Sequence, residues 1–353
     1  FGIAPKTNLF IYLVISLGLL SVWRLHLFPY FSIKQRHKAI IIADGDAAIE
    51  LVDEINNNDR YSYSFVRIID KKTAERTVGF EEKLVALIQK EGIKVIVADP
   101  SSQYTEKVLP AIFDLAFLKF EFVFLDFYKV YEETFDKVPY HTLRYDWFMT
   151  NVSQSRNIVY TFAKRVLDVV GAVVLLVPSA AIFPFVAAAI KIEDVKGDLF
   201  YTTQRIGQYN RQISIYKLRT KNGSDVGEAA LNSDLVDTKV GTFLRKTRLD
   251  ELPQLLNVLR GDLSFIGPRP EMPALAKVYT EEVRYYNARH FIKPGLSGWA
   301  QIHNHDVPRG GVDVERTIEK LSYDLLYLKR RSLLLDMQIA AKTLATIVMR
   351  TGT

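Results

Sequence analysis

The chain has 353 residues, which is enough for two domains, each with its own core. Its apolar fraction of 48 % is high for a chain in which 24 % of the residues are charged, and this combination indicates membrane segments attached to a polar body. The net charge of +6 favours anionic partners such as nucleotides, phosphates or an acidic membrane face. Because the chain contains no cysteine, disulfides and thiolate metal sites are excluded.

The first apolar run extends from Leu9 to Trp23 and continues beyond it. Arg24 does not exclude a membrane helix, because an arginine near a helix end can reach the interface. A buried core helix would need a domain around it, and none precedes this run. Residues 1–33 are therefore predicted to form a transmembrane helix, which could be the last of several because the chain starts at Phe1. The basic residues that follow place the downstream side in the cytoplasm: Lys34, Arg36, His37 and Lys38.

Residues 34–150 are predicted to form a small parallel α/β domain of the Rossmann-like type. The buried strand patterns KAIIIA, SFVRIID, KVIVAD and FEFVFLDF alternate with the amphipathic helix patterns AAIELVDEI and FEEKLVALIQK. A dinucleotide site would require a glycine-rich turn after the first strand, but that turn holds only Gly45. Asp44 and Asp46 could form a metal-binding Asp-x-Asp pair, although an ordinary turn explains them better. We interpret this domain as a regulatory or packing module.

A second apolar run, Val169–Ile190, is long enough to span a bilayer. A single crossing would leave one of its two basic flanks outside the cell, against the positive-inside tendency. Pro178 and Pro184 each remove a backbone donor and bend a helix. We therefore expect a broken, re-entrant helix over about residues 166–191 that dips into one leaflet and returns. A straight transmembrane helix is the alternative.

Two side-chain pairs stand at the start of this run. Asp168 follows Lys164 by four residues, so the two are predicted to pair at the membrane surface. Tyr160 and Lys164 have the Tyr-x-x-x-Lys spacing of some dehydrogenases. Without a glycine fingerprint we interpret that spacing as chance.

The polar part of the chain after Asp198 begins with a basic strand–turn–strand pattern in residues 197–221. A solvated basic face is the simple explanation, but the cluster leads towards a pair of carboxylates. Its basic residues are Arg205, Arg211, Lys217 and Arg219. Residues 321–348 have a helical pattern with aromatic, leucine and Lys/Arg faces. These residues could form a helix that lies in the membrane interface or a helix that packs in the core.

The carboxylate pair Asp250 and Glu251 lies in the segment TRLDELPQLLNVL. A capping box between Thr247 and Asp250 would use Asp250 only to satisfy backbone donors. A helix capped at Thr247 would carry Pro253 in its second turn, where proline is costly. A helix that starts near Leu252, with Pro253 at its first position, is therefore favoured. Both carboxylates then lie beside a helix N-terminus.

Cations surround this pair in the sequence. Arg245, Lys246 and Arg248 precede it, and Arg269 returns in GPRPE, where two prolines restrict its backbone. Two carboxylates among cations can form a site for a phosphate and a divalent ion, with one carboxylate on the metal and the other free to attack. Salt-bridged helix packing explains the same residues equally well.

From Lys164 to its end, the chain resembles the bacterial sugar transferases, the polyprenyl-phosphate glycosyl-1-phosphate transferases or monotopic phosphoglycosyl transferases. The matching runs, in the family's order, are KRVLDVV, AIKIED, QRIGQYNRQISIYKLRT, GTFLRKTRLDELPQLLNVLRGDLSFIGPRPE, RHFIKPGLSGWAQI and YDLLYLKRRSLLLDMQI. The N-terminal half resembles larger members, in which membrane helices and a Rossmann-like domain come first. The resemblance implies an α/β membrane protein whose residues 151–353 form a mixed α/β catalytic domain, anchored by the re-entrant helix and interfacial amphipathic helices.

The resemblance also implies a reaction. A sugar-1-phosphate would pass from a UDP-sugar to undecaprenyl phosphate, with UMP as the second product, in the first membrane step of exopolysaccharide, capsule, O-antigen or other glycan biosynthesis. Asp250 would attack the β-phosphate and carry the phosphosugar covalently, and Glu251 would help to bind Mg²⁺, beside Asp250. Arg245, Arg269 and Pro270 would line the phosphate site. Further candidates for substrate binding are Lys217, Arg219, Arg205 and Asp324.

The implied location is the bacterial inner membrane, with the catalytic domain on its cytoplasmic face. Lys164, Asp168 and Pro184 would belong to the membrane anchor, a homodimer is a possible assembly, and no nucleic acid partner is expected. The chain departs from the family pattern in a few places. Ala180-Ala181 stand where a Ser-Pro usually breaks the re-entrant helix, Gly197-Asp198 replace a Gly-Pro, and Arg248 replaces a common serine.

Two other functions stay open at this point. An NAD-dependent membrane sugar-nucleotide dehydratase would combine membrane helices with a Rossmann-like domain, but the missing glycine fingerprint speaks against it. A non-catalytic scaffold for glycan assembly would not need the acidity of Asp250. None of the readable motifs indicates which sugar a transferase would carry.

Overall fold

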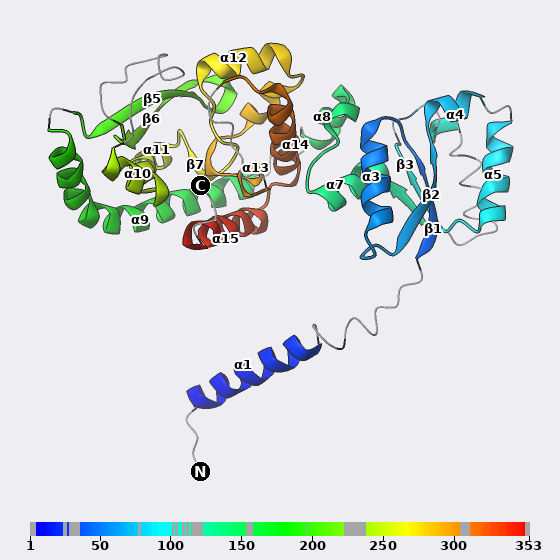
Figure 1. Ribbon diagram of the computed structural model, residues 1–353, viewed down its shortest axis with the longest axis horizontal. Helices are drawn as coiled ribbons and strands as arrows, with labels where there is room; N and C mark the ends of the chain where they lie inside the picture. The colour runs from blue at the N-terminus through cyan, green and yellow to red at the C-terminus, as the bar shows by residue number, and fades with distance from the viewer. Residues whose placement is uncertain are drawn as a thin grey trace. The chain divides into compact units, whose positions relative to one another are not determined.

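The structure is a computed structural model, and it describes residues 5–23, 27, 36–76, 79–100, 102, 105–107, 110, 113, 123–152, 158–195, 197–221, 238–303 and 311–349. The chain groups into two compact units, Phe1–Val130 and Tyr131–Thr353 (Figure 1). The domain bounds expected from the sequence, 34–150 and 151–353, stay predictions.

Helix α1 (Pro5–Val22) forms the described part of the first apolar run. Its large apolar side chains are exposed. The apolar stretch within it, Thr7–Val22, is shorter than most membrane-spanning helices. Residues 24–26 and 28–33 of the predicted span lie outside the described residues. The transmembrane assignment of residues 1–33 therefore stays a prediction.

A four-stranded parallel sheet forms the centre of the first unit, with the strand order β2-β1-β3-β4. Its strands are β1 (His37–Ile42), β2 (Tyr63–Ile69), β3 (Val95–Ala98) and β4 (Val123–Asp126). The connecting helices include α3 (Asp46–Asn57), α4 (Lys71–Arg76) and α5 (Phe80–Glu91). The predicted parallel α/β arrangement of this part is confirmed, although residues 120–122 of the fourth predicted strand lie outside the described residues.

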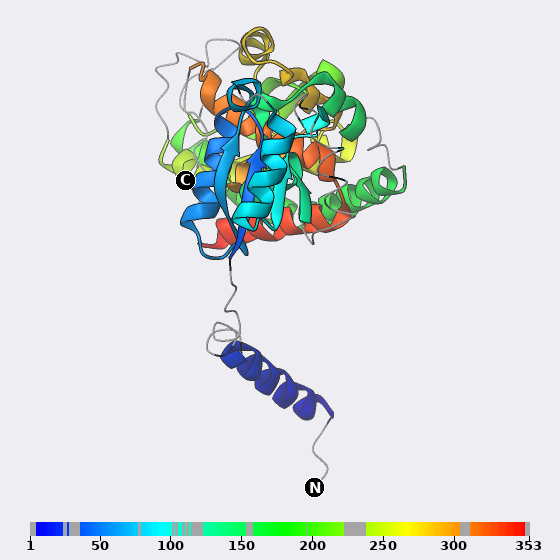
Figure 2. The same ribbon diagram turned by 90° about the vertical axis from the view of Figure 1, so that its right-hand side faces the viewer.

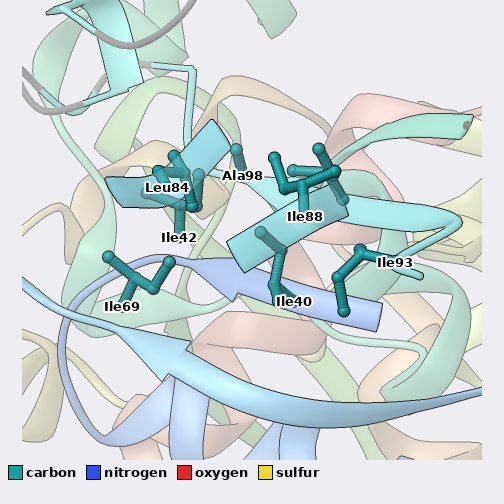
Figure 3. Close-up of a cluster of buried hydrophobic side chains, with 8 residues drawn as sticks. Ile40, Ile42, Ile69, Leu84, Ile88, Ile93 and Ala98 are labelled. Atoms are coloured by element: carbon teal, nitrogen blue, oxygen red, sulfur yellow. The ribbon is translucent and has the colours of Figure 1, made fainter. Parts of the chain in front are cut away.

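The core of this unit lies on both faces of the sheet. The inner strand β1 is buried as a continuous run from Ala39 to Ile42, as expected for a parallel strand covered on both sides. Ile40, Ile42 and Ile96 pack with Leu84 of α5 in one hydrophobic cluster (Figure 3). Helix α3 lies on the opposite side of the strands from α5 (Figure 2).

The turn after β1 has a structural explanation. Gly45 adopts a φ of 84°, which favours glycine. The Asp44 carboxylate accepts a hydrogen bond of 2.6 Å from the backbone N–H of Lys71, and Asp46 lies in the first turn of α3. Across the described ranges, no group of three His, Cys, Asp or Glu side chains is placed to hold a metal ion. These contacts favour the ordinary turn over the metal-binding pair.

The second unit is built from helices around two small sheets. The predicted strand–turn–strand pattern is confirmed as the antiparallel hairpin of β5 (Phe200–Ile206) and β6 (Gln212–Leu218), and β7 (Ser264–Ile266) pairs in parallel with β8 (Gly295–Ser297). Helix α7 (Phe127–Phe135) contains the boundary between the two units. The other helical elements are η2 (Tyr140–Thr142), α8 (Tyr145–Asn151), α9 (Ile158–Glu193), η4 (Gln208–Asn210), α10 (Lys239–Lys246), η6 (Leu249–Glu251), α11 (Gln254–Arg260), α12 (Pro273–Glu282), η7 (Tyr286–Phe291), α13 (Trp299–His303), α14 (Val314–Arg330) and α15 (Leu333–Met349).

Helix α9 contains the second apolar run. It is one α-helix of 36 residues with Pro178 and Pro184 inside it, so it bends without being interrupted. Figure 1 shows that the last turns of its ribbon point in a different direction from the first. Within the described part of the chain, it is the helix that is long and apolar enough to cross a membrane. Whether it re-enters one leaflet stays a prediction.

The two limbs of α9 pack on different parts of the second unit. The limb before the prolines packs Ala172 in a cluster with Leu255 and other residues of α11. The limb after the prolines packs Ile190 in a cluster with Leu218 of β6 and Leu244 of α10. The bend therefore lets one helix support both the hairpin and the α10–α11 segment.

The C-terminal helical pattern forms two helices rather than one. Helix α14 packs into the core and buries Leu321, Leu325 and Leu326, whereas α15 exposes Leu334 and Leu344. Helix α9 also exposes a large apolar surface, whose side chains include Val170, Val174, Val177 and Phe185. The core-packing alternative thus holds for α14, and an apolar face is left exposed on α15.

Gly241 in α10 lies against the backbone of the segment that follows the hairpin. A Cβ atom at Gly241 would lie 2.0 Å from the backbone carbonyl oxygen of Thr220. Only a shift of the backbone could relieve this clash. We expect Gly241→Ala to lower the free energy of unfolding by about 1–3 kcal/mol, although alanine is the better helix former. Thermal melting in detergent would measure the change. Gly18→Ala, with no atom within 4 Å of its Cβ, should not lower the melting temperature, and equal melting of both variants would contradict the prediction.

Candidate active site

Asp250 and Glu251 lie in the short turn η6, between α10 and α11. Thr247 ends α10, because its hydroxyl donates to the carbonyl oxygens of Phe243 and Leu244 at 2.9 and 3.2 Å. It therefore does not cap the next helix, and the capping-box explanation of Asp250 is wrong. Helix α11 begins at Gln254, directly after Pro253, close to the predicted start.

The backbone of Arg248 forms the turn between α10 and η6. It adopts a φ of 58°, a left-handed conformation that costs a non-glycine residue free energy and that the packing around it must maintain. After this turn, Glu251 contacts Lys217 of the hairpin and Arg269 of the Pro-Arg-Pro segment. The departure from the family's serine at this position therefore coincides with a strained turn.

Three cations converge on one oxygen of Glu251. Its Oε1 lies 2.9 Å from Nζ of Lys217, 3.4 Å from a guanidinium nitrogen of Arg269 and 3.7 Å from one of Arg248. Burial alone would raise the pKa of Glu251, but the three cations outweigh it and lower the pKa to about 2. Glu251 is therefore ionised at every physiological pH and holds the three cations together.

Asp250 has the opposite acidity. Its side chain is buried, and burial together with the negative charge of Glu251 raises the pKa of Asp250 to about 6, against the opposing effect of Lys217 and Arg248. Its Oδ1 atom is buried without a hydrogen-bond partner among the described residues. The two adjacent carboxylates thus differ in acidity and in the number of their partners, a pattern that is common at functional sites.

The donor set of this pair fits a magnesium ion that is bound together with a phosphate. Magnesium is usually held by one or two carboxylates, with water and substrate phosphates completing its shell. The unpartnered Oδ1 of Asp250 beside the Glu251 carboxylate supplies that number of protein ligands. In the part of the chain that the structure describes, no third acidic or histidine ligand is placed with them.

Arg205 and Pro270 belong to the wall beside this pair. Arg205, at the end of β5, lies 3.9 Å from the carboxylate of Glu271, and Lys320 of α14 lies 3.3 Å from the same carboxylate. Burial would raise the pKa of Glu271, but its cationic neighbours, Lys320 first, lower it. Glu271 follows Pro270 directly, so this ion-pair group anchors the Pro-Arg-Pro segment to β5 and α14.

Asp324 lies behind the site rather than in it. Its carboxylate forms an ion pair of 2.8 Å with Arg289, and both side chains are only 2 % exposed. Arg289 also donates to the backbone carbonyl of Arg269 at 2.9 Å. Asp324 therefore acts on the site through Arg289 and the backbone of the Pro-Arg-Pro segment.

Two predicted substrate-binding arginines have other surroundings. Arg219 forms an ion pair of 3.1 Å with Asp194, just after α9, and donates to the carbonyl of Lys221 at 2.9 Å. Arg245 is half-buried in the last turn of α10, one turn before the carboxylate pair. Of the predicted cations, Lys217, Arg269 and Arg248 thus form ion pairs with the carboxylate pair, each through Glu251.

The predicted ion pair between Lys164 and Asp168 is wrong. Lys164 lies 2.8 Å from Asp336 of α15, and Tyr160 donates to the same carboxylate at 2.9 Å. Asp168 is buried instead, and it accepts hydrogen bonds of 3.0 Å from the Ser264 hydroxyl and from a backbone N–H of β7. The spacing puts both residues on one helix face, but each has a better partner on another element. Pro184, the third predicted anchor residue, lies inside α9, where the two limbs meet.

Three residues of the site were missed by the sequence reasoning: Glu271, Arg289 and Lys320. Glu271 and Arg289 lie in the runs GPRPE and RHFIKPG, which carry the resemblance. The sequence therefore marked the segments that contain these two residues. Their partners are visible only in contacts between segments that are distant in the sequence.

The bacterial sugar transferase family profile matches residues 159–350. The chain belongs to this family. The matched region contains the carboxylate pair, the hairpin, the Pro-Arg-Pro segment and α14, so the whole site described above lies inside it. The predicted family is thus confirmed.

Similar proteins are known from several bacteria. A UDP-N-acetylgalactosamine-undecaprenyl-phosphate N-acetylgalactosaminephosphotransferase of Aeromonas hydrophila is 38 % identical over 198 residues, which cover 55 % of this chain and 45 % of that protein. A UDP-glucose:undecaprenyl-phosphate glucose-1-phosphate transferase of Caulobacter vibrioides is 40 % identical over 190 residues, which cover 52 % of this chain and 69 % of that protein.

An undecaprenyl-phosphate glucose phosphotransferase of Komagataeibacter xylinus is 30 % identical over 328 residues, which cover 90 % of this chain and 60 % of that protein. Its similarity to this chain extends beyond the family-matched region into the N-terminal unit. The chain spans about half the length of the Aeromonas protein and less than two thirds of the Komagataeibacter protein.

The buried pair of Asp324 and Arg289 is expected to contribute to stability. Asp324→Asn leaves the Arg289 charge buried without a counter-ion, so we expect the free energy of unfolding to fall by about 3–5 kcal/mol. Replacing both residues by apolar ones (Asp324→Leu with Arg289→Met) should cost less than Asp324→Asn alone. Glu315→Gln, on the exposed start of the same helix, is the control and should change stability by less than about 1 kcal/mol. Thermal melts of the four proteins test this order, and a melt of Asp324→Asn equal to that of the control would contradict it.

Proposed function

We propose that this chain transfers a sugar-1-phosphate from a UDP-sugar to undecaprenyl phosphate, with UMP as the second product. The observation that carries the proposal is the adjacent carboxylate pair of unequal acidity, beside cations that suit phosphates. The similar proteins of Aeromonas, Caulobacter and Komagataeibacter, which are named for reactions of this class, support it. The step would be the first membrane step in the biosynthesis of an exopolysaccharide or a related glycan.

In the first half of the reaction, a carboxylate oxygen of Asp250 attacks the β-phosphorus of the UDP-sugar. The bond between that phosphorus and the bridging oxygen breaks, and UMP leaves with the electron pair. In the second half, a phosphate oxygen of undecaprenyl phosphate attacks the same phosphorus, and the carboxylate of Asp250 is regenerated. The raised pKa of Asp250 makes it a more basic nucleophile that is still largely ionised at neutral pH.

The other residues of the site bind and orient the phosphates. Lys217 and Arg269 are held in place by Glu251, so their positive charges are positioned before substrate arrives. Arg205 adds a third charge at the wall formed with Glu271. Asp250 and Glu251 would hold Mg²⁺, which supplies charge neutralisation at the substrate phosphates when bound.

The membrane part of the proposal rests on exposed apolar surface. Helix α9 and helix α15 both expose apolar side chains, and α9 bends at its two prolines. A helix that enters and leaves one leaflet would hold the site at the membrane surface, where a lipid phosphate meets a soluble nucleotide sugar. We place this surface on the cytoplasmic face of the inner membrane, with α1 as a membrane helix.

The dehydratase alternative receives no support from the described residues. Tyr160 and Lys164, which have the spacing of a dehydrogenase pair, both contact Asp336. The scaffold alternative does not explain why a carboxylate oxygen of Asp250 is buried without a partner.

The nucleophile assignment predicts the result of one substitution. Asp250→Asn should lower the rate of UMP release by about 10³-fold or more, since amide nitrogen and oxygen do not replace a carboxylate nucleophile. The assay uses purified protein in detergent, a panel of UDP-sugars, undecaprenyl phosphate and Mg²⁺, and chelation of Mg²⁺ should abolish release. Without the lipid, intact-mass measurement should detect a phosphosugar adduct on the unsubstituted protein and none on Asp250→Asn. Glu282→Gln, an exposed carboxylate, is the control. Full turnover by Asp250→Asn would exclude the assignment.

The raised pKa of Asp250 predicts a pH dependence. The nucleophile must be deprotonated, so kcat/KM for UMP release should fall as the pH drops through about 6. Arg248 lowers the pKa of Asp250, so Arg248→Gln should move this fall to higher pH. Lys277→Gln, at an exposed position of α12, should leave the profile unchanged. A profile of Arg248→Gln that moves to lower pH would contradict this electrostatic account.

A further inference from the structure

Gln254 is a buried polar residue that the mechanism above does not use. It is the first residue of α11 and follows Asp250 by four positions. Its side chain is 5 % exposed, and its Nε2 atom is buried without a hydrogen-bond partner among the described residues. Buried donors of this kind are rare in folded proteins, because each loses its bond to water without replacing it.

The neighbouring amide of Asn257 shows what a structural role looks like in the same helix. Asn257 is fully buried, and its Nδ2 donates to the carbonyl of Ser214 at 2.7 Å. Its Oδ1 accepts from the backbone N–H of Tyr216 at 3.3 Å. Asn257 therefore ties α11 to β6. Gln254 has no such bond for its Nε2, so a role in holding α11 in place does not account for it.

The reactive groups closest to Gln254 in the chain are the carboxylates of Asp250 and Glu251. The chain from Asp250 to Gln254 is helical, since Leu252 and Pro253 have helical dihedral angles. Gln254 precedes Asn257 by three residues in α11, so it lies on the face of the helix that packs on β6, the strand that carries Lys217. Asp250 is also buried and has an unpartnered acceptor, Oδ1. An unpartnered donor and an unpartnered acceptor thus occur four residues apart in the chain, beside the strand that carries Lys217.

The charges of the site indicate what Gln254 would bind. Lys217, Arg269 and Arg248 already lie on the Glu251 carboxylate, whereas the Gln254 donor is neutral and uncommitted. A group that reacts at Asp250 and carries several acceptor oxygens is a phosphoryl group. Its non-bridging oxygens gain charge in the transition state, where a fixed donor in a buried site is most effective.

We propose that Gln254 is a further substrate-contacting residue, whose side-chain N–H donates to a non-bridging oxygen of the phosphoryl group that Asp250 attacks. This inference rests on the proposed function. The ligand oxygen would satisfy the buried Nε2, which explains why the fold keeps an amide at a position where an apolar residue of the same size could pack.

Two substitutions at Gln254 test the proposal. Gln254→Leu keeps the size and removes the polar group, and Gln254→Glu keeps an acceptor but no donor. We expect each to lower kcat for UMP release by about 10²-fold. The melting temperature of Gln254→Leu should be equal to or higher than that of the unsubstituted protein, because no hydrogen bond of Nε2 is lost.

Two control variants separate this role from a structural one. Asn257→Leu removes the bonds to Ser214 and Tyr216, so it should lower the melting temperature clearly. Gln212→Leu, at an exposed position of the hairpin, should change neither the rate nor the melting temperature. A low melting temperature for Gln254→Leu, matching Asn257→Leu, would overturn the proposal in favour of a structural role.

The outcomes also distinguish this inference from the proposed function. Unsubstituted protein that releases UMP, together with Gln254→Leu that keeps its full kcat, would overturn the assignment of Gln254 alone. Unsubstituted protein that releases no UMP from any UDP-sugar, with Mg²⁺ and undecaprenyl phosphate present, would overturn the proposed function and the inference with it.

Discussion

Three positive side chains on one oxygen of Glu251 are the interaction on which the rest of the site depends. Lys217 comes from β6, Arg248 from the turn before η6, and Arg269 from the Pro-Arg-Pro segment. The negative charge of Glu251 offsets the repulsion among these cations. Together with burial, it also raises the pKa of Asp250. One ionised carboxylate thereby allows its neighbour to have a different acidity, and the two can take separate roles in the proposed reaction.

The surrounding fold keeps these segments in register. Helix α9 bends around its prolines and packs on α11 with one limb and on β6 and α10 with the other. From the opposite side, α14 supplies Asp324, which acts through Arg289 on the backbone of Arg269. The site is therefore assembled from segments more than fifty residues apart, and neither local helix propensity nor the carboxylate pair alone would form it.

Much of this arrangement could be predicted from the sequence, for physical reasons that differ between residues. Pro253 revealed where α11 starts because its ring limits the backbone locally, and short apolar runs between helical patterns revealed the strands of the sheet. The partners of Lys164 and Asp324 could not be predicted in this way. Spacing within one helix tells which side chains share a face, but a partner on another element depends on how the elements pack. The unpartnered Nε2 of Gln254 is visible only when its surroundings are known.

The carboxylate of Asp336 receives Lys164 and Tyr160 from α9 and Tyr327 from α14, at distances of 2.7–2.9 Å. One acidic side chain of α15 is thus shared by all three helices. These contacts tie α9 to α15, and both helices expose apolar side chains. If these side chains rest in a bilayer, the contacts at Asp336 set the depth of the protein, and so the height of Asp250 above the lipid headgroups. The access of the proposed site to a lipid phosphate would then depend on a contact that lies outside the site.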